Sequence, residues 1–434
     1  MKVLVVHPLG LRFSGYPYIE EKVQALARHG VEVAVVAPFK DETTMVDGRA
    51  PTFPRIALAF DRHGWMTREA RRAITRFEPD VIHVWTPRAL PSRIALEARV
   101  ATGADVIVNY EDPEHLHFEQ AEGPFRSRDV LAPLDKANPT PDDIGRFLRD
   151  MPWDWVLGTL RAPFATPFLH PLFFGLLNQS AAGFTGIWKP WVDLLATRFE
   201  RPSLLMPLAV DLARLRPPSP EAIAQFRASL GMAPDALLLL RAGVLYSFVD
   251  DQTPMLEGYA AFLRTQPDAR LVMCGHNYQE GRIAAALERY GITDKVRWLG
   301  FLDAPDYAAL LHAADVTLCP GYPDEYNRFR LAGKIVEYMI AGRPMICYAS
   351  GIGEDLVDGR DALLLDPYTP ENVERQLTRA VDPDLRRRLG SRAHALAREW
   401  FDVVPLAARL AAFYRSCVAD AAARADRVPA VQER

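Results

Sequence analysis

Short runs of apolar, mostly β-branched residues recur along the first part of the chain. They lie at residues 3–6, 31–36, 81–84 and 106–108 and do not alternate with polar positions. Strands that are buried on both faces of a parallel sheet have this pattern. Between the runs, residues 18–29 and 67–77 repeat apolar positions with the period of a helix. The alternation of strand and helix predicts a doubly wound parallel sheet.

The same alternation restarts after a proline-containing segment at about residues 207–218. Before this segment, two further strands are predicted at residues 183–187 and 203–206. After it, strands are predicted at residues 237–240, 270–274, 296–299, 316–319 and 345–348. Helical patterns separate the later strands, and the last of them covers residues 333–341. The sequence therefore predicts an α/β protein with two Rossmann-like, doubly wound domains facing each other across a cleft.

The predicted boundaries follow from these patterns. We expect domains at residues 1–207 and 208–398, a helix at 399–420 that packs back on the first domain, and a frayed tail at 421–434. The rhythm fails at about residues 115–180, a stretch rich in Pro, Phe and Trp that is too long for an ordinary connection. We interpret it as an elaboration of the first domain. Its aromatic part is expected to form core, with a hydrophobic acceptor groove as the alternative.

Length and charge exclude several classes of protein. A chain of 434 residues exceeds the size at which one hydrophobic core usually stops growing. With 51 Lys and Arg against 55 Asp and Glu, the net charge of −4 provides no broad cationic field for nucleic acid. We therefore expect two domains and no nucleic-acid partner.

Cysteine usage and apolar segments indicate the compartment. The 4 cysteines are scattered and form no zinc-binding pair spacing, which fits a reducing cytoplasm. The longest apolar stretch, residues 162–177, is interrupted by prolines and is shorter than the roughly 20 residues that span a bilayer. We expect a cytoplasmic protein without a transmembrane helix.

Residues 327–344, NRFRLAGKIVEYMIAGRP, carry the most informative chemistry. They follow a predicted strand and open a helix at about Ala332 and Gly333, where free amides and the helix dipole favour an anion. Arg328 and Arg330 precede this point, so we predict a diphosphate site. The alternative is a set of solvated arginines beside an exposed Lys–Glu pair on the helix.

The helix that follows adds two more candidates on one face. Lys334 and Glu337 are three residues apart, so the lysine can add charge while the glutamate accepts hydrogen bonds from both hydroxyls of a ribose. The pattern K-x-x-E-Y-x-x-A-G-x-P, with GIGEDLVDG at residues 351–359, resembles the donor-binding signature of family-four glycosyltransferases of the GT-B fold. Residues 79–84, 206–211 and 296–300 resemble further segments of that family in the same order.

The resemblance implies a nucleoside-diphosphate sugar as donor. It places the amides that hold the diphosphate on Leu331, Ala332 and Gly333, and the ribose-binding glutamate on Glu337. The other residues assigned to the donor side are Gly15, Gly243, Leu302, Arg328 and Glu354.

The chain also departs from the family pattern on the donor side. An arginine and a lysine of the family are absent from the loop that holds residues 243–245 and Asp251, and Phe329 replaces the first glutamate of the family's E-x7-E pair. Our hypothesis is that Arg328, Arg330 and Lys334 supply the lost positive charge.

On the acceptor side, the family's His-Asp pair corresponds to Glu111 and Asp112, which follow the fourth predicted strand. Carboxylates there could bind sugar hydroxyls or act as a base on the acceptor. The alternative is a loop turn before Pro113. His83 and Trp85 are further candidates, although a buried core histidine is the commoner outcome. The predicted catalytic set is Glu111, Asp112, Arg330 and Lys334.

The resemblance implies transfer of a sugar to an acceptor hydroxyl with retention at the anomeric carbon. We expect no metal ion and no cofactor, a carbohydrate or lipid-linked acceptor, a role in glycan or polysaccharide biosynthesis, and peripheral contact with the inner face of a membrane. Two alternatives remain open: a catalytically silent GT-B protein that binds a ligand or partner, and an epimerase-like enzyme acting on free nucleotide sugar.

Overall fold

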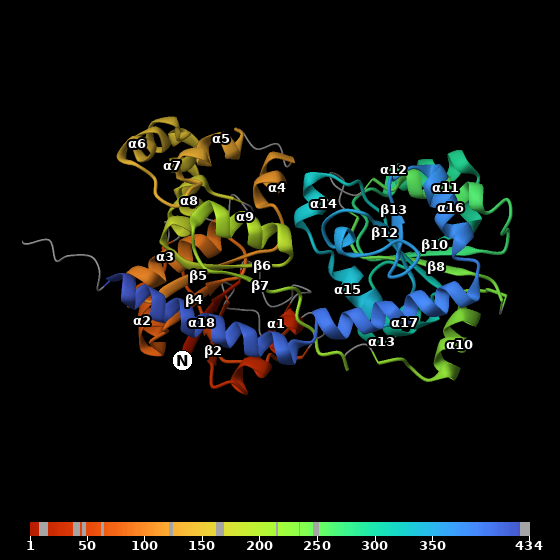
Figure 1. Cartoon of the computed structure of the whole chain (residues 1–434), viewed down its shortest axis with the longest axis horizontal. Coiled ribbons are helices and arrows are strands. Elements are labelled where there is room, and N and C mark those ends of the chain that lie inside the picture. The colour runs from red at the N-terminus through yellow and green to blue at the C-terminus, as the bar shows by residue number, and fades with distance from the viewer. Residues whose placement is uncertain are drawn as a thin grey trace, which may run out of the picture. The chain divides into compact units, whose positions relative to one another are not determined.

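The chain forms two compact units in the computed structural model (Figure 1). The first unit contains residues 1–210 and the segment from Val403 onward, and the second contains residues 211–402. The predicted boundaries after residues 207 and 398 lie a few residues earlier than these divisions. The structure describes residues 1–7, 16–37, 44–45, 49–61, 65–120, 125–161, 169–213, 216–233, 235–245 and 251–425.

The first unit is built on a seven-stranded parallel sheet of order β3-β2-β1-β4-β5-β6-β7. The strands are β1 (Lys2–Val6), β2 (Glu32–Ala37), β3 (Arg55–Ala57), β4 (Val81–Val84), β5 (Asp105–Tyr110), β6 (Ala181–Gly186) and β7 (Ser203–Leu205). The central strands β1 and β4 are buried, as the unbroken apolar runs predicted. The short edge strand β3 was not predicted.

Four helices along the first unit connect these strands: α1 (Tyr16–Ala27), α2 (Arg68–Phe77), α3 (Ala89–Thr102) and α9 (Lys189–Phe199). The later helix α18 (Val403–Ala425) packs against α1. Its Leu406, Leu410 and Tyr414 side chains belong to the same buried cluster as Val3 and Val5 of β1. Because α18 continues to Ala425, the tail expected to fray from residue 421 is helical at its beginning.

The predicted elaboration of the first unit is helical. It contains α4 (Glu114–Gln120), α5 (Ser127–Leu131), a 3₁₀ turn (Ala132–Leu134), α6 (Pro141–Asp150), α7 (Trp153–Arg161) and α8 (Pro171–Ser180). Figure 1 shows α5, α6 and α7 grouped together, and α8 packs against both α3 and α5. The Trp155 ring lies edge-on to Phe118 and Phe125, with centroid distances of 5.7 and 5.2 Å. Most of the aromatic residues described here therefore form core.

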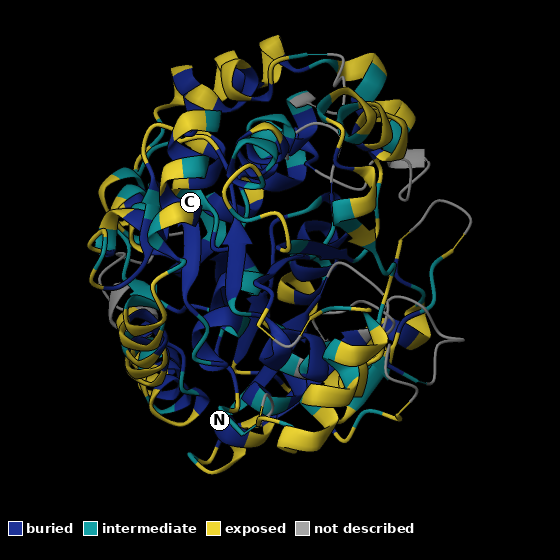
Figure 2. Cartoon of the chain, turned by 90° about the vertical axis from the view of Figure 1, so that its right-hand side faces the viewer, coloured by how far each residue is buried: buried dark blue, intermediate teal, exposed yellow. Residues whose placement is uncertain are grey.

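The second unit has a six-stranded parallel sheet of order β10-β9-β8-β11-β12-β13. The strands are β8 (Leu238–Ala242), β9 (Arg270–Cys274), β10 (Val296–Trp298), β11 (Val316–Cys319), β12 (Met345–Tyr348) and β13 (Leu363–Leu365). Its helices are α10 (Pro220–Ser229), α11 (Thr253–Phe262), α12 (Glu280–Tyr290), α13 (Ala304–Ala313), α14 (Glu325–Phe329), α15 (Gly333–Ile340), α16 (Pro370–Arg379) and α17 (Pro383–Trp400). Figure 2 shows buried strands surrounded by helices whose outer faces are exposed. The prediction of two doubly wound α/β domains is confirmed.

Candidate active site

The strand order of the second sheet reverses between β8 and β11, because β9 and β10 lie on one side of β8 and the later strands lie on the other. Ligands of open parallel sheets bind outside the carboxyl ends of the strands at such a point. The backbone amide of Ala242, the last residue of β8, donates a 2.8 Å hydrogen bond to the Tyr338 hydroxyl of α15. Helix α15 therefore packs against the strand end where a ligand is expected.

The amino terminus of α15 lies where the sequence predicted it. Ala332 is the N-cap residue, with φ −65° and ψ 122°, and its methyl side chain cannot accept a hydrogen bond from the first helical amides. Leu331 and Ala332 are buried and Gly333 is partly exposed. Backbone amides and the positive end of the helix dipole together suit a phosphate group at this position. The assignment of Leu331, Ala332 and Gly333 to a diphosphate stays a prediction.

Lys334 extends from the first turn of α15 toward the loop after β8. A Cβ atom placed on Gly243 would lie 3.4 Å from the Lys334 Nζ, and Gly243 has a φ of +98° that other residues rarely adopt. The backbone amide of Gly243 donates to the Cys274 carbonyl at 2.9 Å, so this loop is fixed to the end of β9. The structure thus brings two predicted residues, Lys334 and Gly243, into contact at the strand ends.

Glu337 is held by a residue that sequence analysis missed. The Tyr307 hydroxyl of α13 donates a 2.6 Å hydrogen bond to Glu337 Oε2. Burial, reinforced by the nearby Glu337 charge, raises the pKa of Tyr307 well above its usual value, so the hydroxyl remains a donor. Tyr307 lies 30 residues before Glu337 on another helix, and spacing along the sequence could not reveal the pair. The hydrogen bond fixes the orientation of the carboxylate.

The two predicted arginines of this region have different surroundings. Arg328 is 60% exposed, and its Nε lies 4.0 Å from Oε1 of Glu354. Oε1 of Glu354 also accepts a 3.4 Å hydrogen bond from the Gly351 amide. The Arg330 guanidinium instead lies 5.2 Å from the centre of the Tyr326 ring. Glu354 is therefore an ion-pair partner of Arg328, and the joint role of Arg328, Arg330 and Lys334 stays a hypothesis.

A buried arginine lies beneath the loop after β8. Arg241 is fully buried, and its Nη1 donates to the carbonyls of Gly243 at 2.8 Å and Val244 at 3.3 Å. The sequence showed that this loop lacks two cations expected from the family pattern. It did not show that the guanidinium group of Arg241, in the adjoining strand β8, contacts the backbone of the loop. The signal was present, because Arg241 interrupts an otherwise apolar strand.

Three other donor-side positions are placed as follows. Asp251 accepts hydrogen bonds through Oδ1 from Arg282 Nη2 at 2.7 Å and from the Thr253 amide at 3.0 Å, just before α11. Leu302 is partly exposed in the connection between β10 and α13. Gly15 lies outside the described residues.

The first sheet reverses its strand order between β1 and β4. Glu111 follows β5 at the same edge, where Asn109 Nδ2 donates to its Oε1 at 3.3 Å and the nearby Trp85 side chain favours its charged form. Lys22 of α1 is only 5% exposed, and its Nζ lies 3.6 Å from the centre of the Trp85 ring. Sequence analysis missed Lys22, because its position within a helical pattern gave no indication of its burial beside Glu111.

Burial has opposite effects on these two charged groups. It raises the pKa of Glu111 to about 7, while the positive charge of Lys22 acts to lower it. It lowers the pKa of Lys22 to about 7, and the charge of Glu111 acts to raise it. A carboxylate that titrates near neutrality at a sheet switch point is a candidate for acid–base chemistry.

Asp112 and His83 lie in other surroundings. Asp112 Oδ2 is 3.7 Å from Nε2 of His117, so Glu111 and Asp112 face different partners. His83 is buried, with Nδ1 2.7 Å from the Tyr414 hydroxyl and Nε2 3.3 Å from the Thr185 hydroxyl. Burial lowers the pKa of His83 to about 3, which keeps the imidazole neutral. His83 is thus a core histidine, the commoner of the two outcomes considered.

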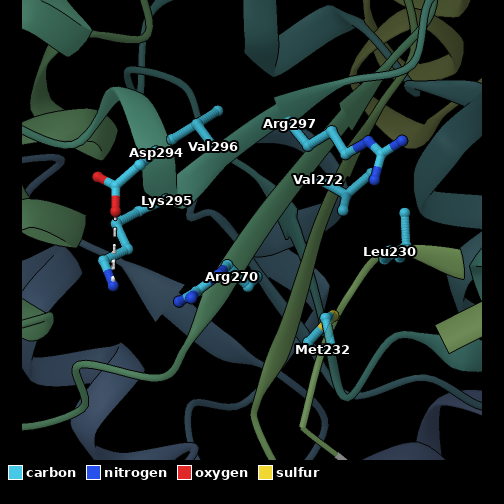
Figure 3. Close-up of a pocket in the computed structure, with 8 residues that line it drawn as sticks. All are labelled: Leu230, Met232, Arg270, Val272, Asp294, Lys295, Val296 and Arg297. Atoms are coloured by element: carbon cyan, nitrogen blue, oxygen red, sulfur yellow. Dashed lines mark ion pairs between the residues drawn. The ribbon is translucent and has the colours of Figure 1, made fainter. Parts of the chain in front are cut away.

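A separate pocket of about 260 Å³ lies at the opposite edge of the second sheet (Figure 3). Its residues include Arg270 at the start of β9 and Arg297 in β10, as well as Lys295 and Asp294 just before β10. The Lys295 Nζ donates to the Pro267 carbonyl at 3.0 Å. These charges stand at the amino ends of the strands and do not belong to the candidate active site.

The described residues offer neither a metal cluster nor a membrane-spanning helix. Within these residues, no group of three or more His, Cys, Asp and Glu side chains is arranged to hold a metal ion. Among the described helices, none has the length and apolar character required to cross a bilayer.

The fold is shared with solved proteins of known class. HepE from Anabaena, solved in complex with UDP and glucose, aligns with a TM-score of 0.69 over 96% of this chain and 100% of its own, at 16% sequence identity. Sucrose-phosphate synthase from Thermosynechococcus elongatus aligns with a TM-score of 0.66 over 97% of this chain and 100% of its own, at 16% identity. The protein therefore has the GT-B fold.

Family models narrow the class. Residues 17–139 match the model described as Glycosyltransferase Family 4, and residues 237–382 match the model described as Glycosyl transferases group 1. These matches confirm the resemblance to family-four glycosyltransferases that was identified in the sequence.

Curated relatives match part of the chain. The D-inositol 3-phosphate glycosyltransferase of Streptomyces bingchenggensis is 29% identical over 204 residues, covering 44% of this chain and 43% of the relative. The 2-deoxystreptamine glucosyltransferase of Streptomyces kanamyceticus is 29% identical over 116 residues, covering 26% and 29%. The chain spans about half the length, or less, of the curated relatives it matches.

Proposed function

We propose that this protein transfers a sugar from a nucleoside-diphosphate donor to a hydroxyl group of an acceptor. The contact of Lys334 with the loop after β8 carries the proposal. It places a cation next to the amino terminus of α15, which has no side-chain cap, at a sheet switch point. The Tyr307–Glu337 hydrogen bond supports it by presenting an oriented carboxylate for the ribose.

In the proposed reaction, a bond forms between the acceptor oxygen and the anomeric carbon of the donor sugar. The bond between that carbon and the diphosphate oxygen breaks, and the electron pair leaves with the nucleoside diphosphate. Amides of α15 and Lys334 stabilise the developing charge. The acceptor hydroxyl donates a hydrogen bond to the carboxylate of Glu111 in the first unit, and this carboxylate is the proposed base that takes the proton from the acceptor oxygen.

The finer parts of the proposal rest on the family resemblance. We propose retention at the anomeric carbon, a carbohydrate or lipid-linked acceptor, and a role in glycan or polysaccharide biosynthesis on the cytoplasmic side. HepE was solved with UDP and glucose, and this supports a uridine nucleotide sugar as the first donor to test. The names of the curated relatives support cyclitol phosphates and aminocyclitols in an acceptor panel.

Binding of a nucleoside diphosphate tests the donor site. A ligand present at 100 times its dissociation constant stabilises a protein by about 2.7 kcal/mol, which raises the melting temperature of a domain of this size by about 5 °C or more. We expect such a shift with one nucleoside diphosphate, equally in EDTA and in Mg²⁺ if the proposed metal independence holds. No shift with any nucleoside diphosphate would contradict the donor site.

Turnover distinguishes the proposed reaction from its alternatives. Sugar transfer requires an acceptor, whereas an epimerase-like enzyme would convert the nucleotide sugar without one. Nucleotide release and product formation, assayed with and without the acceptor panel, separate these cases, and a silent binding protein would show neither.

Peripheral membrane contact is proposed for the exposed apolar side chains of α6 and α7. Ile144 and Leu148 lie one turn apart on α6, and Trp153 and Leu157 lie one turn apart on α7; their exposed fractions are 44%, 44%, 39% and 49%. The Trp153 indole donates to the Leu148 carbonyl at 2.8 Å, so the two pairs are adjacent. Exposed Trp and Leu side chains suit a lipid headgroup region, and Arg146 and Arg149 of α6 are also exposed.

Vesicle binding tests this surface. We expect the protein to co-sediment with vesicles containing anionic lipid, and we expect the double variant Trp153→Ser, Leu157→Ser to lose at least about 1 kcal/mol of binding free energy. The matched control is Val100→Ser, which removes an exposed apolar side chain on α3. Equal sedimentation of the double variant and the control would contradict membrane contact through α6 and α7.

A further inference from the structure

Lys22 occupies an unusual position in the first unit. It lies on α1 and is 5% exposed, with its ammonium group 3.6 Å from the centre of the Trp85 ring. A buried ammonium group requires compensation, because removal of its water shell is costly. Part of that compensation comes from the face of the indole, and part from the negative charge of Glu111.

Trp85 connects the two charged groups. It follows β4 directly, and its backbone carbonyl accepts a 2.8 Å hydrogen bond from Asn109 Nδ2, which also donates to Glu111 Oε1 at 3.3 Å. The Trp85 side chain also favours the charged form of Glu111, while its ring faces Lys22. One cluster at the carboxyl ends of β4 and β5 therefore contains the carboxylate of Glu111, the indole of Trp85, the amide of Asn109 and the ammonium group of Lys22.

The hydrogen-bond network around Asn109 continues into the core of the first unit. Thr185 Oγ1 donates to Asn109 Oδ1 at 2.7 Å, and the Thr185 hydroxyl lies 3.3 Å from Nε2 of His83. His83 in turn lies 2.7 Å from the Tyr414 hydroxyl of α18. This chain of contacts holds Asn109, and with it one oxygen of Glu111, in a fixed position.

We infer that Lys22 is a positioning residue that keeps Glu111 charged. The charged carboxylate of Glu111 can then accept a hydrogen bond from the acceptor hydroxyl. The inference deepens the proposed function and rests on it. A charged carboxylate accepts a hydrogen bond from a sugar or cyclitol hydroxyl, whereas a protonated carboxyl group competes as a donor. The ammonium group of Lys22 favours the charged form and is itself shielded from solvent.

Other charged groups also face this pair. Asp112 adjoins Glu111 in sequence and disfavours its charge, while Arg88, after β4, favours it. The positive charge of Lys22 also lowers the pKa of His83 in β4, which favours the neutral imidazole. Lys22 is the largest favourable influence of a charge on Glu111, because the effect of Arg88 is smaller and Arg88 is already paired with Glu114 at 2.9 Å.

The test compares Lys22→Met with Lys22→Arg. Methionine has similar length and no charge, so the pKa of Glu111 should rise and the acidic limb of kcat/KM for the acceptor should move upward by about one pH unit. At pH 6.5 we expect about a tenfold loss of kcat/KM, and at pH 9 a much smaller loss. Arginine keeps the charge and should restore the acidic limb. Lys189→Met is the matched control, because Lys189 also lies near an indole, 5.9 Å from the Trp188 ring centre.

A second readout does not depend on turnover. Carboxyl ¹³C NMR of glutamate-labelled protein, with Glu111→Gln to assign the resonance, should show the Glu111 midpoint moving to higher pH in Lys22→Met. An unmoved midpoint and an unmoved acidic limb would overturn the inference, even if the variant lost activity or stability. Absence of transfer by the wild-type protein would instead contradict the proposed function, while the NMR midpoint would still decide whether Lys22 sets the charge of Glu111.

Discussion

Replacing Glu111 by glutamine is expected to lower kcat for sugar transfer by about 10²- to 10⁴-fold, the usual loss when a positioned acid–base group is removed. Glutamine has nearly the same shape, and Asn109 and Trp85 can still approach it, so the fold should persist. Because Glu111 lies in the first unit, the affinity for the nucleoside diphosphate should be unchanged. Steady-state kinetics together with calorimetric nucleotide binding provide the measurement.

The neighbouring carboxylate supplies a control for that prediction. Asp112→Asn alters a side chain that faces His117 and should reduce kcat far less than Glu111→Gln does. Equal losses in the two variants would indicate that the loop after β5 acts as a whole, and a Glu111→Gln enzyme with normal kcat would remove Glu111 from the reaction.

The second large effect is expected at Lys334. Lys334→Met removes the ammonium group that lies beside Gly243 at the start of α15, and with it a charge-assisted contact worth about 1.5–3 kcal/mol. We expect the best-bound nucleoside diphosphate to lose about 10- to 100-fold in affinity, measured by isothermal titration calorimetry. The corresponding nucleoside, which lacks phosphates, should bind both proteins equally.

Lys295→Met is the matched control, since Lys295 belongs to the same unit but lines the pocket at the opposite edge of the sheet. Arg330→Ala, measured in parallel, tests the hypothesis that this arginine also replaces the missing family cations. Unchanged diphosphate affinity in Lys334→Met would show that the phosphates bind elsewhere.

Much of the fold could be predicted from the sequence because buried parallel strands appear as unbroken apolar runs. Two of the missed elements lack such a pattern. β3 has only three residues and begins with Arg55, and α3 is buried on several faces, so its apolar positions show no helical period. β13 was missed although residues 362–365 form an apolar run. The helix start at Gly333 was predicted correctly, although the apolar residues Leu331 and Ala332 precede it directly.

The candidate site was predictable only within single elements. Spacing placed Lys334 and Glu337 on one helical face and Glu111 after a strand, but it could not reveal partners from other elements. Tyr307, Arg241 and Lys22 come from another helix, an adjacent strand and the first helix of the chain. Their roles follow from tertiary contacts, which a single sequence does not specify.

The return of the chain to the first unit has a consequence for biosynthesis. The Val403 amide donates to the Val210 carbonyl at 3.1 Å, and α18 then supplies buried side chains beside β1. Residues 1–210 leave the ribosome first, but the core of their unit stays incomplete until α18 has been made. The six described strands of residues 211–402 have all been made before α18 emerges. The second unit can complete its folding ahead of the first unit, although most of it is translated later.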